Sequence, residues 1–132
     1  MARALSMVSR IGFVLSAAAA LALVSTTAQA GDAAKGAEVF KQCAACHNIE
    51  KGGGNGILGP NIFGVVGRKA ASAPGFAYSA PFKASEIVWT DVELKKWILN
   101  PQKEVPGTKM LLIHPLNAEQ ADDVIVFLNT KK

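Results

Sequence analysis

Apolar positions recur at helical spacing near the start of the chain's globular part. Gly36, Phe40, Cys43 and His47 lie three or four residues apart, so they share one face of a helix, and Asp32 is a suitable N-cap for it. A glycine inside a helix costs about 1 kcal/mol relative to alanine. We therefore expect a second helix to approach closely at Gly36.

Two later segments repeat this pattern. The stretch Thr90-Asp91-Val92-Glu93 is typical of a capping box, and it predicts a helix that ends at Asn100-Pro101. The stretch 117–120 predicts the start of a last helix. The inward residues of the first of these helices are Leu94, Trp97 and Ile98, and those of the last are Ala121, Val124, Ile125, Phe127 and Leu128.

The segments between these helices predict loops. Four of the six residues 51–56 are glycine, residues 58–79 are rich in Gly, Ala, Ser and Pro without a sustained period, and residues 102–116 form a second loop. No convincing strand pattern and no internal repeat is present. The sequence predicts a small all-α domain with three main helices, short helical turns and long loops.

The first thirty residues have the pattern of a secretory signal peptide. Arg3 and Arg10 precede an apolar run over 11–24, and Ala28-Gln29-Ala30 supplies a cleavage site. A membrane anchor is the alternative, but fourteen apolar residues fall short of the ~20 that a spanning helix needs. We expect cleavage after residue 30, export to the periplasm and a single mature domain, residues 31–132.

Charge gives little indication of a nucleic-acid partner. Without the leader, twelve basic side chains stand against ten acidic ones, a net charge of +2. This value is too small to predict nucleic-acid binding.

The stretch Cys43-Ala44-Ala45-Cys46-His47 contains the side chains best suited to bind a metal or cofactor or to undergo redox chemistry. A redox dithiol is one interpretation, but a thioredoxin-like site needs a preceding strand, and a plain structural disulfide is another. Zinc is a third, but closed zinc sites use four ligands, usually in two separated pairs, and the nearest further ligand is His114. C-x-x-C-H is also the attachment signature of c-type haem, with two thioethers to the porphyrin and the histidine beneath the iron.

A second axial ligand of the haem iron can be sought by elimination among the methionines. Methionine sulfur is a common sixth ligand of haem iron. Of the three methionines, Met1 and Met7 leave with the leader, so Met110 alone remains, in the loop Pro106-Gly107-Thr108-Lys109-Met110. A lone methionine is more often core filler, and His114 is the rival ligand.

From residue 31 to about residue 128 the chain resembles the class I cytochromes c, close to mitochondrial cytochrome c and its bacterial relatives. The matching motifs occur in order: CAACH, Leu58-Gly59-Pro60-Asn61, Gly67-Arg68-Lys69, Ala73-Pro74-Gly75-Phe76-Ala77-Tyr78, Val88-Trp89 and PGTKM. The resemblance implies one covalent haem c, anchored by Cys43 and Cys46, with His47 and Met110 as axial ligands of the iron.

The resemblance also implies roles for other residues. The Pro60 carbonyl should accept the His47 ring N–H, Arg68, Tyr78 and Trp89 should surround a buried haem propionate, and Gly36 and Phe40 should meet Phe127. Three positions depart from the mitochondrial pattern. Trp97 stands where a tyrosine is usual near the methionine sulfur, Phe82 replaces a polar residue near the propionates, and Leu112 replaces an aromatic residue.

With both axial positions filled, this centre is predicted to carry one electron and not to act as an enzyme. The resemblance implies partners such as a quinol–cytochrome c reductase, a terminal oxidase, a photosynthetic reaction centre or a periplasmic reductase, served by a monomeric shuttle. The alternative is a five-coordinate haem enzyme or gas sensor, if Met110 is a labile ligand. Six lysines fall in segments that could ring the haem edge and steer the carrier toward acidic partners: Lys41, Lys83, Lys95, Lys96, Lys103 and Lys109.

Overall fold

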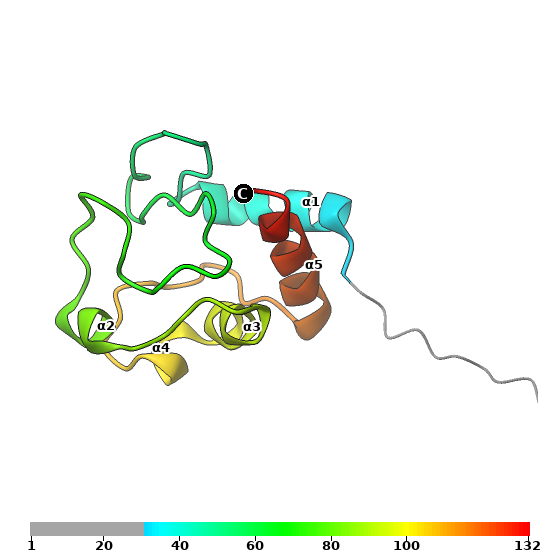
Figure 1. Ribbon diagram of the computed structural model, residues 1–132. Helices are drawn as coiled ribbons and strands as arrows, with labels where there is room; N and C mark the ends of the chain where they lie inside the picture. Colours follow the sequence, from blue (N-terminus) through cyan, green and yellow to red (C-terminus); the bar gives the residue numbers. More distant parts are fainter. Residues whose placement is uncertain (1–30) are drawn as a thin grey trace, which may run out of the picture.

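The computed structural model describes residues 31–132, so the predicted signal peptide, residues 1–30, lies outside the described residues. The helices are α1 (Ala33–Ala44), α2 (Ala80–Ala84), α3 (Asp91–Leu99), α4 (Pro101–Glu104) and α5 (Ala118–Asn129) (Figure 1). The three predicted helices are confirmed as α1, α3 and α5. Within residues 31–132 there is no strand, only one isolated bridge between Lys69 and Val88, and no helix is both long and apolar enough to cross a membrane.

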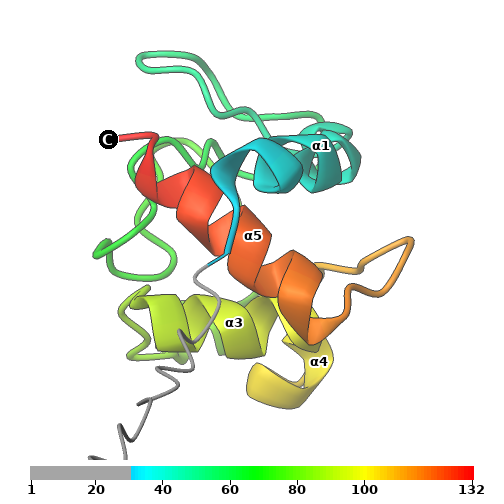
Figure 2. The ribbon, with the colours of Figure 1, turned by 90° about the vertical axis from the view of Figure 1, so that its right-hand side faces the viewer.

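The crossing of α1 over α5 organises the fold (Figure 2). A Cβ atom added at Gly36 would lie 2.0 Å from the backbone oxygen of Asp123 and 2.9 Å from Cβ of Phe127. Glycine therefore lets the two helix backbones come into contact. One turn later the rings of Phe40 and Phe127 pack with their centroids 5.2 Å apart, which confirms the predicted contact of Gly36 and Phe40 with Phe127.

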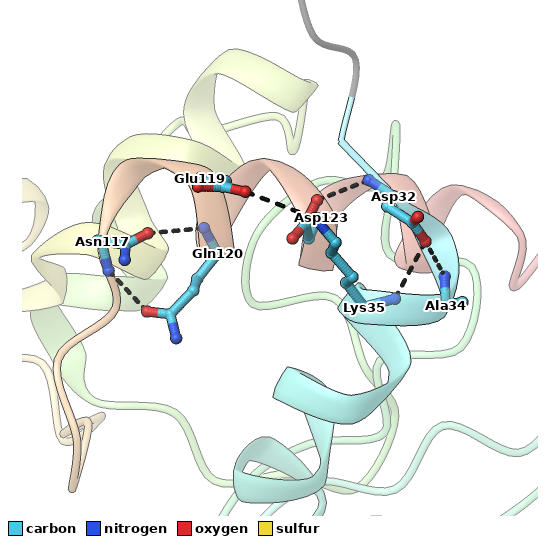
Figure 3. A network of polar contacts seen from close by, with 7 residues as sticks. All are labelled: Asp32, Ala34, Lys35, Asn117, Glu119, Gln120 and Asp123. Carbon is cyan, nitrogen blue, oxygen red and sulfur yellow. Dashed lines mark hydrogen bonds and ion pairs between the residues drawn. The ribbon is translucent and has the colours of Figure 1, made fainter.

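Polar contacts also hold the start of α1 against α5 (Figure 3). The Asp32 carboxylate accepts from the backbone N–H groups of Ala34 and Lys35 and so caps α1. The backbone N–H of Asp32 donates to the buried carboxylate of Asp123, at 2.6 Å. The start of α1 is thus tied directly to the middle of α5.

The capping box predicted at Thr90 and the helix start predicted at Asn117 differ in outcome. At α5 both halves form, because Asn117 accepts from the Gln120 backbone and the Gln120 side chain accepts from the Asn117 backbone (Figure 3). At α3 only half forms: Thr90 accepts from the Glu93 backbone N–H. The carboxylate of Glu93 pairs instead with Lys96, one turn along the helix, so it does not reach back to the cap.

The segment predicted as a second loop contains a short helix. Pro101 starts α4 in the position where its missing N–H is harmless, and the Asn100 side chain accepts from the Lys103 backbone N–H. Helix α3 packs against both α4 and α5. The remaining chain, residues 45–79 and 105–117, runs as long loops around the helices (Figure 1).

Candidate haem site

A cavity of about 350 Å³ lies between the helices and the two long loops. The predicted site residues all line it: Cys43, Cys46, His47, Pro60, Arg68, Tyr78, Trp89, Trp97 and Met110. These residues come from segments far apart in the sequence. The structure therefore brings together the complete set that the sequence singled out.

His47 projects from the turn that ends α1. Its Nδ1 lies 2.9 Å from the Pro60 carbonyl oxygen. Because a carbonyl can only accept, Nδ1–H is the donor, and Nε2 keeps its lone pair free to bind a metal. Burial lowers the pKa of His47, which also favours the neutral, ligating form, although the Pro60 bond opposes this shift.

The loop around Pro60 needs a glycine beside this ring. A Cβ atom added at Gly59 would lie 2.4 Å from Cε1 of His47. The Gly59 backbone N–H also donates to the carbonyl of Cys46, at 2.9 Å. The loop is thereby held against the turn that contains Cys46 and His47, and it packs directly against the imidazole ring.

Cys43 and Cys46 lie on the same turn and are not joined in a disulfide. Burial, and then the neighbouring Cys46 thiol, raise the pKa of Cys43 to about 11. A redox dithiol requires the opposite shift, and α1 stands where such a site would have a strand. Within residues 31–132 no three His, Cys, Asp or Glu side chains cluster as a metal site.

Met110 is held in the cavity wall by its own loop. The side-chain amide of Gln102 donates to the carbonyl oxygen of Thr108 at 2.7 Å and to that of Met110 at 3.3 Å. Gly107 turns the chain with a φ of +83°, a conformation that favours glycine. Gln102 was missed from the sequence, because its contact is made through the backbone and leaves no motif.

The rival ligand, His114, is exposed and does not line the cavity. It lies four residues beyond Met110, in the same loop. Of the two candidate ligands, only Met110 lines the cavity.

A polar group of side chains forms another part of the wall. The Arg68 guanidinium donates to the carbonyls of Phe63 and Asn61, at 3.1 and 3.0 Å, while its buried Nε has no partner. The Tyr78 hydroxyl accepts from the Ala73 backbone N–H at 3.1 Å. The buried Oγ of Ser79 also has no partner. A buried polar atom without a partner is costly, so these groups indicate a polar ligand.

Ser79 is a site residue that sequence reasoning missed. A serine after Tyr78 has no distinctive spacing, and only its burial against the cavity without a hydrogen bond identifies it.

Aromatic side chains make the adjoining part of the wall. The ring of Trp97 packs against Phe82 and Trp89, with centroids 5.0 and 5.4 Å away. Tyr78 stacks on Phe82 at 5.3 Å. Trp97 therefore belongs both to the buried core and to the cavity wall, and Phe82 makes this wall apolar.

Comparison with known proteins accounts for this arrangement. The sequence profile described as Cytochrome c matches residues 33–132. The chain belongs to the cytochrome c family. Cytochrome c2 of Rhodomicrobium vannielii is 43% identical over 113 residues, which cover 86% of this chain and 90% of that protein. Cytochrome c2 of Rhodoblastus acidophilus is 45% identical, covering 78% and 95%.

A solved structure supports the same assignment. Cytochrome cH from Methylobacterium extorquens has a TM-score of 0.68 and 45% identity, and the match covers 76% of this chain and all of that one. As a cytochrome c, the protein has the all-α cytochrome c fold, carries covalent haem c with its iron, and transfers electrons; it is not an enzyme.

The cavity of this cytochrome c suits its cofactor. The two cysteines and His47, whose Nε2 is free, lie on one turn, and the sulfur of Met110 comes from another segment. Apolar and aromatic side chains make up most of the wall. The unpartnered Arg68 Nε and Ser79 Oγ provide donors for a carboxylate. These residues match a flat apolar group with an iron at its centre and acidic substituents on one edge.

Proposed function

We propose that the protein is a one-electron shuttle whose haem iron is held by His47 and Met110. The observation that carries this proposal is that both residues line one cavity, each from a separately stabilised loop or turn. Pro60 orients the imidazole, and Gln102 holds the loop of Met110. Cys43 and Cys46 are the anchors of the two thioether bonds.

The bound haem supplies an iron that changes its charge by one electron. The residues around the haem keep the same arrangement in the oxidised and reduced states of the iron. With His47 and Met110 both bound to the iron, no coordination position would remain open for a substrate, and the apolar wall from Phe82, Trp89 and Trp97 would exclude water. A sulfur ligand and an apolar wall both favour the reduced, less charged state.

We further propose that the polar wall binds a haem propionate. Arg68, Tyr78, Trp89 and Ser79 line the same cavity and offer N–H and O–H groups. Trp97 lies in the adjoining aromatic wall. We propose that its indole N–H lies near the Met110 sulfur.

The ligand assignment is tested by the ferric optical spectrum. Methionine sulfur on ferric iron gives a weak far-red band, and we expect it in the native protein and in His114→Ala, but not in Met110→Ala. We also expect Met110→Ala to bind carbon monoxide rapidly, as the native protein should not. A native protein without the band, or one that binds carbon monoxide at once, would favour the five-coordinate enzyme or sensor.

We propose that the shuttle works in the periplasm as a monomer after removal of residues 1–30. The cytochrome c profile begins at residue 33, close to the predicted cleavage point, which supports this proposal. Its partners would be a quinol–cytochrome c reductase and a terminal oxidase, photosynthetic reaction centre or periplasmic reductase.

Processing is tested by mass spectrometry of the protein purified from the periplasm. We expect the mass of residues 31–132 plus one haem. Replacement of Ala28 and Ala30 by arginine should block cleavage and leave the protein in the membrane fraction. A periplasmic protein that keeps residues 1–30 would contradict this.

A further inference from the structure

Asn55 uses both ends of its side-chain amide within the long loop that carries Pro60. Its Oδ1 accepts from the backbone N–H of Asn61 at 2.9 Å, and its Nδ2 donates to the carbonyl of Pro74 at 3.0 Å. Because an N–H can only donate and a carbonyl can only accept, these two partners assign the orientation of the amide. One half-buried side chain thus joins two segments of the loop region.

The N–H that Asn55 binds belongs to the same peptide group as the carbonyl that holds His47. This group, here called the 60–61 peptide group, joins Pro60 to Asn61 and is trans. Its oxygen accepts from Nδ1–H of His47 at 2.9 Å, and its N–H donates to Oδ1 of Asn55 at 2.9 Å. Because a peptide group is planar, a bond that fixes the N–H also fixes the direction of the carbonyl.

The same bond strengthens the Pro60 carbonyl as an acceptor. An N–H that donates polarises its peptide group, so the oxygen at the other end accepts more strongly. A stronger bond at Nδ1 in turn makes the imidazole of His47 a more basic ligand at Nε2. Asn55 can therefore act on both the orientation and the electron density of this ring through the 60–61 peptide group.

The side chain of Asn61 holds other parts of the loop. Its Nδ2 donates to the carbonyls of Glu50 and Gly53, at 2.9 and 2.8 Å, and its Oδ1 accepts from the Phe63 backbone N–H at 2.8 Å. None of these bonds involves the atoms of the 60–61 peptide group. Among the described residues, Asn55 alone accepts from the N–H of that group.

Asn48 offers a comparison within the same loop. Its Nδ2 donates to the carbonyl of Gly54, and its Oδ1 accepts from the Glu50 backbone N–H, both at 2.9 Å. It therefore makes the same two kinds of bond as Asn55, but neither reaches the 60–61 peptide group. Loss of either asparagine removes two bonds from the loop, and only one of the two losses frees the peptide group that holds His47.

We propose that Asn55 is a positioning residue for His47, acting through the 60–61 peptide group. This rests on the proposed ligation of the haem iron by His47. A more basic imidazole stabilises ferric iron more than ferrous iron, because the ferric ion has the higher charge. Hydrogen bonding around an axial ligand is one of the means by which a protein sets a haem potential. Asn55 therefore lowers the reduction potential of the carrier.

The test compares the native holoprotein with Asn55→Leu, whose side chain can neither donate nor accept a hydrogen bond. In a spectroelectrochemical titration at fixed potential, we expect the ratio of ferrous to ferric protein to rise about threefold, which corresponds to ~28 mV at 59 mV per tenfold. Exchange of the His47 Nδ1 proton with solvent, followed by NMR of the ferrous protein, should become about tenfold faster. Asn55→Ala should move both measurements in the same direction, so the test does not depend on one variant folding.

Two variants separate positioning from loop stability. Asn48→Leu also loses two bonds of the loop, but it should leave the potential and the Nδ1 proton exchange unchanged. Asn55→Asp keeps an oxygen for the Asn61 N–H and loses the donor to Pro74. It should unfold at lower urea concentration, while exchange of the Nδ1 proton stays within about twofold of the native rate. The far-red band should remain in every variant.

Three results would overturn the proposal. Native potential and native exchange in Asn55→Leu would show that the 60–61 peptide group keeps its place without Asn55. Equal shifts in Asn55→Leu and Asn48→Leu would show that both asparagines serve only the stability of the loop. A native ferric protein whose NMR spectrum lacks the strongly shifted ring protons of a ligating histidine would overturn the assignment of His47 itself.

Discussion

Tyr78 is the only tyrosine of the chain and lies at the cavity wall, where its hydroxyl accepts a bond from the Ala73 backbone. Burial raises its pKa, and the Ala73 bond and the Arg68 charge oppose that shift without cancelling it. At the scale of single residues, therefore, the site keeps this phenol neutral.

This shift predicts a stability change at high pH. Because the folded pKa lies above the unfolded value of about 10, the stabilisation is present below pH 10 and is lost as pH rises through the folded pKa. Tyrosinate absorbance of the native protein should therefore develop above pH 10. Tyr78→Phe should remove this part of the pH dependence of unfolding. A midpoint at or below 10 would contradict the prediction.

At the scale of elements, the α1–α5 crossing depends on the missing side chain of Gly36. We expect Gly36→Ala to lower the free energy of unfolding by about 3 kcal/mol, although alanine favours a helix, because the Asp123 carbonyl leaves no room for Cβ. Urea denaturation of the haem-containing protein measures this.

Gly54 provides the matched control for that substitution. A Cβ atom at Gly54 would meet nothing within 4 Å, and its φ is not positive. Gly54→Ala should therefore change the free energy of unfolding by less than about 1 kcal/mol. Equal losses for the two variants would mean that close helix contact is not the cause.

At the scale of the whole molecule, the cavity is as important as the helices. The cavity of about 350 Å³ is lined by core side chains such as Trp89, Leu94 and Trp97, which would lose packing partners if the cofactor were missing. Small domains have a total stability of about 5–15 kcal/mol, so such a loss matters. We therefore expect the chain to depend on its cofactor to stay folded.

This dependence can be measured by preventing haem attachment. The double variant Cys43→Ser, Cys46→Ser should lose most of its helical circular dichroism and its cooperative thermal transition. The native protein, prepared in the same host, is the reference. A haem-free chain that keeps native helicity and a sharp transition would show that the helices alone form a sufficient core.

Sequence analysis predicted best the interactions between residues that are close together in the chain. Helix starts at Asp32, Thr90 and Asn117 were predictable, because each cap bonds to residues two or three positions away. The missed parts have other causes. The Glu93 carboxylate had two possible partners three residues away and pairs with Lys96, not with its cap, while Gln102 contacts backbone atoms six and eight residues away and leaves no motif.

The sequence by itself determined which residues can bind the haem: Cys43, Cys46 and His47 by their spacing, and Met110 as the one methionine in residues 31–132. These are properties of neighbouring residues and of composition, so no coordinates are needed to see them. Tertiary structure decided which side chains share the cavity, that Ser79 and Arg68 have unpartnered atoms there, which lysines are paired, and that Asn55 bonds to the peptide group that holds His47. Each of these depends on the meeting of residues far apart in the chain, which only packing determines.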